Sequence, residues 1–210
     1  MKKRLIVLLI VVCVLLPATL SAAMVDLSIG ATALYNQTFT QMQTAFDAED
    51  YTGFSTFENY AFGADVRMKI LLAEVDLVGM FGQETIGGTD YTTISVLTAG
   101  GISLDILNFA RLGFAMGPRF NVYIDSATGE AQVKDSNNVL VDWNNFGDAF
   151  LKSPVAYRAT VDFDLGGLML GLNYTVDTLY TFENWDKVQD LFDADPNGGK
   201  VGISLLFSLL

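Results

Sequence analysis

Charged side chains recur at every second position on two neighbouring stretches of the sequence. Asp65, Arg67 and Lys69 lie on the first stretch, and Glu74 and Asp76 lie on the second. Acids and bases that alternate in this way can pair with one another, and away from water an unpaired charge would be costly. Inside a narrow pore such a set forms either a filter that selects ions or a plug that closes the bore.

The sequence contains no histidine and a single cysteine, Cys13. The absence of histidine excludes a Ser-His hydrolase and a His-ligated metal centre, and it removes the usual general base for chemistry on lipids. We therefore predict a protein that is not an enzyme and that needs no cofactor.

The residues between these charges are mostly apolar, so the two faces of each stretch differ. From residue 59 to residue 70 the even positions carry the apolar side chains, and from residue 75 to residue 81 the odd positions do. A period of two is typical of a β-strand, because successive side chains leave the backbone on opposite sides.

A turn at residues 71–72 predicts one register for these two strands. In that register opposite charges face each other and apolar side chains face each other, and a shift of one residue would undo both. The predicted neighbours are Lys69 with Glu74, Arg67 with Asp76, Met68 with Val75, Val66 with Leu77, and Phe62 with Phe81.

The same alternation in further segments makes eight predicted strands, at residues 24–36, 59–70, 73–82, 92–104, 109–123, 153–165, 168–176 and 201–209. Short turns at 71–72, 105–108 and 166–167 alternate with longer connections at 37–58, 83–91, 124–152 and 177–200. This asymmetry is typical of bacterial outer-membrane barrels with both termini in the periplasm. We predict an all-β, eight-stranded antiparallel up-and-down transmembrane β-barrel.

The first 23 residues have the features of a secretory signal peptide. Residues 2–4 are basic, residues 5–16 form a short apolar run, and small residues precede a predicted cleavage site after Ala23. The run is shorter than the roughly 20 residues that a membrane-spanning helix needs. We predict residues 1–23 as a removed leader and residues 24–210 as the barrel domain. A lipoprotein acylated at Cys13 is the alternative, but valines occupy the two preceding positions where small residues would be expected.

The chain is acidic, with 12 Lys and Arg against 24 Asp and Glu and a net charge of -12. Such a chain should repel nucleic acid, which binds basic surfaces. Beyond the leader no segment approaches 18 consecutive apolar residues, so we predict no helical membrane span.

The polar face of the predicted barrel suits a narrow lumen. It is rich in glycine and alanine, which leave room in an eight-stranded bore, and its acids and bases are close to balance. We therefore predict that the apolar face meets lipid and that charges fill and close the lumen. The predicted network comprises Asp65, Arg67, Lys69, Glu74, Asp76, Arg111, Arg119, Arg158, Asp162 and Asp164.

Four tyrosines lie on the apolar face at the loop ends of their predicted strands, namely Tyr35, Tyr60, Tyr157 and Tyr174. Aromatic side chains at these positions are typical of the girdle that marks a membrane–water interface. We predict that these four tyrosines form such a girdle.

In this pattern the chain resembles the small eight-stranded outer-membrane proteins of the OmpX, OmpW and OmpA transmembrane-domain type. The resemblance rests on the girdle tyrosines, the facing charges and the final strand at 201–210. It implies recognition by the outer-membrane insertion machinery, although the last strand of the family usually ends in Phe or Trp. Here the strand ends in Leu210, with Phe207 three residues earlier. The family implies passive structural barrels, displays of adhesive loops, or narrow conduits for small hydrophobic molecules.

Asp193, Asp195 and Asn197 have the spacing of the first half of an EF-hand loop. The twelfth position of that motif is Ser204 instead of a bidentate glutamate. We therefore predict no metal site and regard these three residues as a weak calcium candidate. A turn beside a short helix at 183–192 explains them equally well.

The long connections are rich in aromatic residues: Phe39, Phe46, Tyr51, Phe54, Phe57, Trp143, Phe146, Tyr180, Phe182 and Trp185. Such side chains either bind a partner at the surface or pack the loops against each other, and we favour packing.

The sequence as a whole predicts a small non-enzymatic outer-membrane barrel, structural or surface-interacting, in contact with outer-membrane lipid. The first alternative is a narrow conduit for small hydrophobic molecules, since Met80, Leu97, Met169, Leu206 and Leu210 share the polar face. The second is a soluble secreted or periplasmic barrel that turns its apolar face inward around a ligand.

Overall fold

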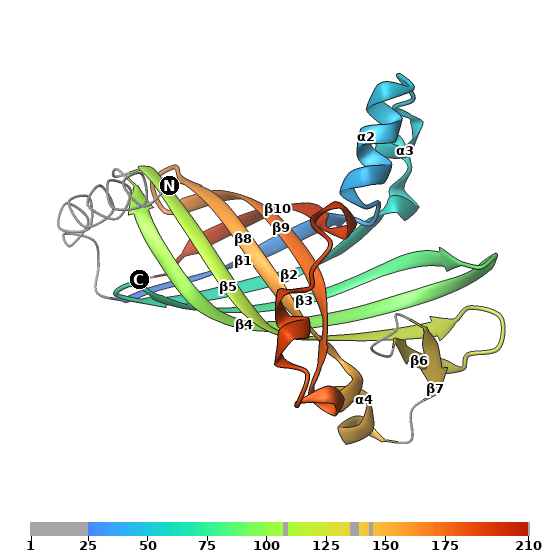
Figure 1. Cartoon of the computed structure of the whole chain (residues 1–210). Helices are drawn as coiled ribbons and strands as arrows, with labels where there is room; N and C mark the ends of the chain where they lie inside the picture. The colour runs from blue at the N-terminus through green and yellow to red at the C-terminus, as the bar shows by residue number, and fades with distance from the viewer. Residues whose placement is uncertain (1–24, 107–108, 135–138, 143–144, 210) are drawn as a thin grey trace, which may run out of the picture.

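A computed structural model describes residues 25–106, 109–134, 139–142 and 145–209, and within them eight antiparallel strands close into a barrel (Figure 1). Around the barrel the strands follow the order β4, β3, β2, β1, β10, β9, β8 and β5, and pairing of β4 with β5 completes the ring. The predicted eight-stranded up-and-down barrel is confirmed. The strands are β1 (Val25–Tyr35), β2 (Tyr60–Ile70), β3 (Ala73–Ile86), β4 (Thr89–Ile106), β5 (Ala110–Asp125), β8 (Pro154–Asp164), β9 (Leu168–Thr181) and β10 (Lys200–Ser208). The predicted leader lies outside the described residues.

The remaining elements gather at one end of the barrel (Figure 1). Strand β6 (Ala131–Lys134) pairs with β5, and β7 (Leu140–Asp142) pairs with β6. The helices are α2 (Phe39–Asp47), α3 (Thr52–Ser55) and α4 (Phe146–Lys152), with short 3-10 helices η2 (Phe57–Asn59), η4 (Phe182–Asn184), η5 (Val188–Phe192) and η6 (Pro196–Gly198). Across the part of the chain that the structure describes, no helix is long and apolar enough to cross a membrane.

The register of β2 and β3 is the one that the charge pattern predicts. Lys69 lies opposite Glu74, and Phe62 lies opposite Phe81. Between β8 and β9 the turn uses Gly166 and Gly167, whose φ angles of 85° and 91° are in the region that only glycine adopts readily. Both short turns therefore hold the strands in the predicted alternation.

The predicted connection at 83–91 is wrong. Strand β3 continues to Ile86 and β4 begins at Thr89, so this segment is the tip of a hairpin. Gly87 and Gly88, at φ 61° and 87°, form its turn. Because a glycine pair supplies positive φ at no steric cost, the strands can continue to the turn itself.

The predicted short helix at 183–192 is also wrong. This segment contains parts of the 3-10 helices η4 and η5, and β9 extends to Thr181 before them. Asp190 and Asp193 each donate their backbone N–H to the carbonyl three residues earlier, on Lys187 and Asp190. The short 3-10 turns lead the chain back beside β9, where Leu179 donates its backbone N–H to the carbonyl of Asp193 at 3.1 Å.

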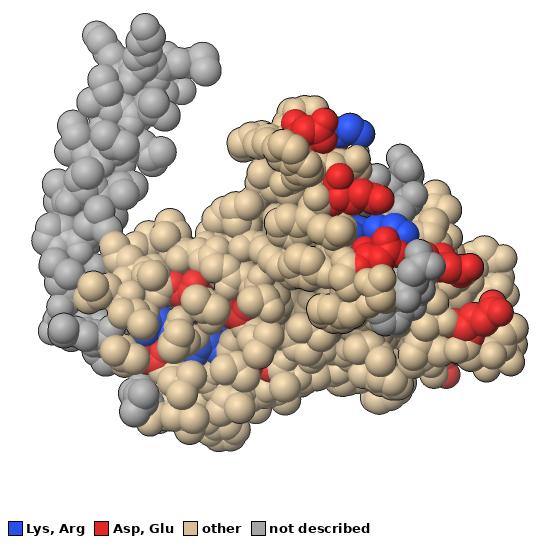
Figure 2. Space-filling model, turned by 90° about the horizontal axis from the view of Figure 1, so that it is seen from below, with Lys and Arg blue, Asp and Glu red and all other residues tan. Residues whose placement is uncertain are grey.

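The barrel is polar inside and apolar outside, which is the reverse of a soluble protein. The inward face buries charged side chains, each at most 2% exposed: Asp65, Arg67, Glu74, Asp76, Arg158 and Asp162. The outward face exposes large apolar side chains, among them Leu77, Phe81, Ile102, Phe114 and Phe207. Figure 2 shows a surface made largely of uncharged residues, with charged side chains gathered at the end with the short turns and over the loops.

Candidate functional site

Five charged side chains form an ion cluster that crosses the lumen. Arg67 of β2 has Nη2 at 2.9 Å from Oδ2 of Asp65 and Nη1 at 2.6 Å from Oδ2 of Asp162, on the opposite strand β8. Arg158 has Nη2 at 2.6 Å from Oδ2 of Asp65 and Nη1 at 3.4 Å from Oδ2 of Asp76. We call these five residues the central ion cluster. It joins β2, β3 and β8 through the middle of the bore.

Further ion pairs lie nearer the short turns. Nε of Arg111 lies 3.0 Å from Oδ1 of Asp105, and Nη2 of the same arginine contacts Asp26. Lys69 also contacts Asp105. These side chains are between 4% and 20% exposed, so they lie where the lumen meets water at the turn end.

Some lumen oxygens have no partner within the described residues. Oε2 of Glu74, Oδ1 of Asp76, Oγ of Ser103 and Oγ1 of Thr160 are buried without a hydrogen bond. A Cβ on Gly113 would lie 2.4 Å from Oγ1 of Thr160 and 3.0 Å from Oε1 of Glu74. Glycine at this position therefore gives Glu74 and Thr160 the room that they occupy in the lumen.

The facing charges of β2 and β3 are in register but pair elsewhere. Lys69 lies opposite Glu74 yet contacts Asp105, and Arg67 contacts Asp65 and Asp162. Inward side chains of a narrow barrel converge on its axis, so an acid across the bore can be nearer than the neighbour on the next strand.

Two residues of the predicted network lie elsewhere. Asp164 is exposed, and its Oδ1 accepts hydrogen bonds from the backbone N–H groups of Gly166 and Gly167. It therefore caps the turn at the end of β8, where an aspartate can hold the backbone two residues further on. Arg119 lies toward the loop end and pairs there with Asp177.

Between the central ion cluster and the loop end, small and apolar side chains fill the bore. Two cavities of about 20 Å³ each, which is room for roughly one water molecule, lie toward the loop end, and Val78, Met80 and Leu97 line one of them. The buried side chains of this apolar layer are Val78, Leu97, Ala99, Ala115 and Ala156, with Met80 packed against them. The layer and the ion cluster together obstruct the described part of the lumen.

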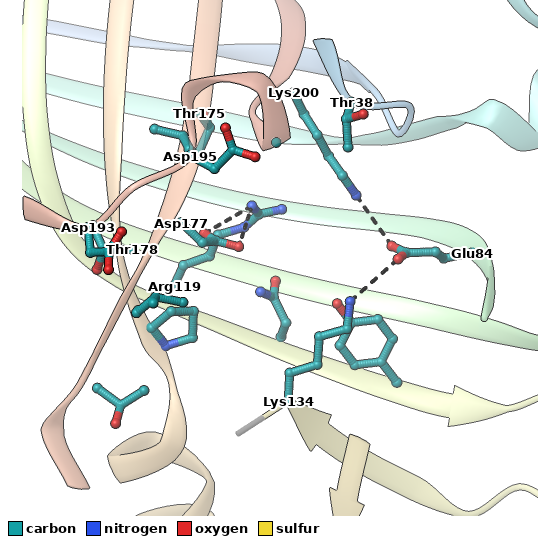
Figure 3. A pocket seen from close by; sticks show the side chains of 17 residues that line it. Thr38, Glu84, Arg119, Lys134, Thr175, Asp177, Thr178, Asp193, Asp195 and Lys200 are labelled. Carbon is teal, nitrogen blue, oxygen red and sulfur yellow. Dashed lines mark hydrogen bonds and ion pairs between the residues drawn. The ribbon is translucent and has the colours of Figure 1, made fainter. Parts of the chain in front are cut away.

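At the loop end lies a cavity of about 470 Å³, which we call the mouth cavity (Figure 3). Glu84 lies between two lysines, with Oε2 at 3.3 Å from Nζ of Lys200 and Oε1 at 3.6 Å from Nζ of Lys134. Nη1 of Arg119 lies 3.3 Å from Oδ1 of Asp177. We call these contacts the mouth ion pairs.

The mouth ion pairs shift the acidity of their members. Burial alone would raise the pKa of Glu84, but Lys200 and Lys134 outweigh it and hold the pKa below its ordinary value. Glu84 is therefore held in its charged form.

The predicted network did not include several residues that the structure brings to these sites. Glu84 continues the even-numbered inward positions of β3, and Asp105 continues the odd-numbered inward positions of β4. Following the alternation past the predicted strand ends would have identified both. Lys134, Asp177 and Lys200 come from predicted loops, for which the sequence carries no comparable signal.

The four predicted girdle tyrosines all face outward near the loop end, and three hold loop backbone. The hydroxyl of Tyr60 donates to the carbonyl of Phe54 at 2.8 Å, and that of Tyr157 donates to the carbonyl of Leu191 at 2.9 Å. Tyr174 bonds the carbonyl of Pro196, and Tyr35 stacks on Phe54 with ring centroids 5.0 Å apart. These tyrosines fasten the loops to the barrel.

The weak calcium candidate lies at the mouth cavity. Asp193 and Asp195 line the cavity, and Oδ1 of Asp195 accepts the backbone N–H of Asn197 at 2.9 Å, which caps η6. Among the described residues no group of three or more His, Cys, Asp or Glu side chains is placed to hold a metal ion.

The aromatic loop residues divide into packed and exposed sets. Phe46, Tyr51 and Phe54 contact one another in the first loop, with centroid separations of 5.4 to 6.5 Å. Phe57 and Trp185 are 74% and 73% exposed. Packing therefore explains part of the aromatic content of the loops.

Comparison with known proteins yields a structural similarity alone. No protein-family model matches the sequence, and no curated protein matches it. The crystal structure of Neisserial surface protein A aligns with 89% of this chain and 96% of its own, at 9% sequence identity and a TM-score of 0.40. At this score the similarity supports no functional conclusion, and the barrel assignment rests on the strand pairing itself.

Proposed function

We propose that this chain is a non-enzymatic outer-membrane β-barrel protein with a closed lumen, and that its role is structural or one of surface interaction. The observation that carries the proposal is the exposed apolar outer face of the barrel. In water such a face would drive association, whereas in a bilayer lipid chains cover it.

The pairing of the backbone supports a membrane location. The eight barrel strands form a closed ring, so no barrel strand leaves an open edge to lipid. Together with the predicted leader, this favours export and insertion into an outer membrane. A soluble ligand-binding barrel needs an apolar interior, and the buried central ion cluster opposes that alternative.

The filled bore supports a closed lumen over a conduit for hydrophobic molecules. Arg67 links opposite walls of the barrel, and the cavity that the apolar layer above it borders measures only about 20 Å³. A hydrophobic solute needs a continuous apolar passage. The fully buried arginines interrupt any such passage.

The expected partners follow from the surfaces of the molecule. Outer-membrane lipid would cover the apolar band, and the insertion machinery would engage the final strand, β10. The exposed Phe57, Trp185 and Phe192 offer contact residues to a surface partner. The net charge of -12 disfavours nucleic acid, and the lack of histidine disfavours general-base catalysis.

Detergent dependence tests the membrane assignment. We expect the chain after residue 23 to fold only with micelles or lipid, and its mobility on a gel to change when the sample is boiled. A monodisperse, folded monomer in detergent-free buffer would overturn the assignment.

Ion conductance in planar bilayers tests the closed lumen. We expect the parent barrel to add no current to the bare bilayer. Replacing all five residues of the central ion cluster with alanine, together with Met80→Ala and Leu97→Ala in the apolar layer, removes both obstructions without leaving cluster charges unpaired, and this variant should conduct measurable current. Steady current through the parent protein would refute the closed lumen while leaving the membrane assignment intact.

A further inference from the structure

The mouth cavity has the size of a binding site for a small molecule. Its volume of about 470 Å³ is within the range of roughly 300 to 1,000 Å³ that is typical of ligand pockets. Its walls come from β3, β5, β6, β9, β10 and the segment before η6. Several chain segments far apart in sequence thus converge on one hollow, which the closed lumen leaves as a blind pocket.

The inner wall of the cavity carries a surplus of positive charge. Three cations, Arg119, Lys134 and Lys200, share the two carboxylates of Glu84 and Asp177 (Figure 3). The three ion-pair distances, between 3.3 and 3.6 Å, are longer than those of strong charge-assisted hydrogen bonds. An added anionic group would therefore meet cations whose charge is only partly compensated.

Arg119 is the best-placed donor for such an anion. Its side chain is 11% exposed, and the residue lines the mouth cavity and both small cavities beneath it. Nε donates to Oγ of Ser95 at 3.1 Å, and Nη1 contacts Asp177. These contacts fix the guanidinium, and the two N–H groups of Nη2 take no part in them.

The segment between η5 and η6 brings negative charge to the same cavity. Asp193 and Asp195 line the cavity, and neither forms an ion pair with a Lys or Arg among the described residues. They come from the segment between η5 and η6, whereas the cations belong to β5, β6 and β10. The lining thus combines cations from the strands with two carboxylates from a loop, and it includes the apolar residues Pro154, Val176 and Leu179.

We propose that the mouth cavity binds a small zwitterion, with its anionic group at Arg119, Lys134 and Lys200 and its ammonium group at Asp193 and Asp195. A simple anion would gain the first contact but would be repelled by the two aspartates. A simple cation would be attracted by the two aspartates but repelled by Arg119, Lys134 and Lys200. The short hydrocarbon between the charges of an ω-amino acid suits the apolar part of the lining.

Matched ligands that differ in one charged end test this proposal. The folded barrel in an uncharged maltoside detergent is titrated by calorimetry with 5-aminopentanoate, pentanoate and pentylammonium, and with the shorter and longer zwitterions 3-aminopropanoate and 8-aminooctanoate. We expect at least one zwitterion to bind ten times or more as tightly as either single-charge compound. Equal binding of a single-charge compound, or no binding of any zwitterion, would overturn the proposal.

Charge-neutral variants locate the site. The double variant Asp193→Asn/Asp195→Asn keeps the oxygen that caps η6 and removes both charges, so it should fold and lose at least tenfold in zwitterion affinity. Arg119→Gln should lose as much, and Lys134→Gln serves in its place if that variant fails to fold. Lys152→Gln, whose ion pair with Asp148 lies outside the cavity, is the matched control and should bind as the parent does.

Unchanged affinity in the aspartate double variant would refute the assigned ammonium site. Unchanged affinity in the variant of the cationic wall would refute the anion site. Neither result depends on the membrane assignment, because detergent dependence and gel mobility are measured separately on the same samples.

Discussion

The central ion cluster and the mouth ion pairs both join acidic to basic side chains, but in two different environments. In the cluster the nitrogen–oxygen distances run from 2.6 to 3.4 Å and the side chains are at most 2% exposed. At the mouth the distances run from 3.3 to 3.6 Å and the exposure from 11% to 38%. The difference shows that the exposure of an ion pair to water determines what the pair can do. Fully buried pairs close the bore, whereas partly hydrated pairs remain available to a ligand.

Removing one arginine from the central ion cluster should have the largest effect. Arg67→Met leaves Asp65 and Asp162 short of a buried partner, so we expect a loss of about 3–5 kcal/mol in the free energy of unfolding. Urea titration in micelles, followed by tryptophan fluorescence, measures it. Lys152→Met, at a partly exposed helix pair, is the control and should cost about 0.5 kcal/mol or less. If Arg67→Met lowers the free energy of unfolding by less than about 1 kcal/mol, the buried cluster contributes no more than the exposed pairs at the mouth.

Crowding the cluster from β9, the strand next to β8, should have the next largest effect. A Cβ at Gly171 would lie 2.3 Å from Oδ1 of Asp162 and 3.3 Å from Nη2 of Arg67. We expect Gly171→Ala to cost about 1–3 kcal/mol, because the buried side chains have little freedom to move. Gly79→Ala is the control, since a Cβ there meets no atom within 4 Å. Equal unfolding free energies for the two variants would contradict a tightly packed lumen.

Acid should weaken the mouth ion pairs through Glu84. The pKa of its carboxyl is below the ordinary value in the folded barrel, so its stabilising contribution is present above the unfolded pKa and is lost as pH falls through the folded pKa. The parent should therefore be more stable than Glu84→Gln at pH 7, and the difference should shrink below about pH 4. Unfolding free energies of both proteins across this range measure it. A difference that is constant with pH would exclude Glu84 as the group responsible.

Loss of a mouth lysine should have the smallest effect. Lys134 lies 3.6 Å from Glu84 and 4.8 Å from the ring centre of Tyr123, at partial exposure. We expect Lys134→Met to cost about 1 kcal/mol or less and the loss to disappear at about 1 M salt, where charges are strongly screened. The loss in Arg67→Met should persist at the same salt concentration. If the loss in unfolding free energy for Lys134→Met does not change with salt, the Lys134–Glu84 pair behaves like the buried pairs of the central ion cluster.

Sequence pattern predicted the barrel because period-two alternation and short turns are local properties. The register that places Lys69 opposite Glu74 and the turn at Gly166 and Gly167 needed only neighbouring residues, and both are confirmed. The true length of β3 and β4 was missed because Gly87 and Gly88 were assigned to a loop. A glycine pair marks a tight turn as readily as a long connection.

Partners inside the lumen could not be predicted from strand neighbours. Arg67 and Asp162 meet because eight strands close into a ring, which brings residues 95 positions apart into contact. The mouth cavity was missed for a related reason. Lys200 and Glu84 meet across 116 positions, and Lys134 belongs to a short strand inside a predicted loop.

The long separations within the lumen also bear on how the chain assembles. Arg67 finds Asp162, and Asp65 accepts a hydrogen bond from Ser204 on the last strand, 139 positions away. A sheet that still lacked β8 or β10 would present these charges without those partners. Contacts of such range form late and slow the search, and here they are satisfied only when the ring is complete. Closure of the barrel and burial of its charges are therefore one cooperative event, and a truncated or half-inserted barrel gains little of the stability of the whole.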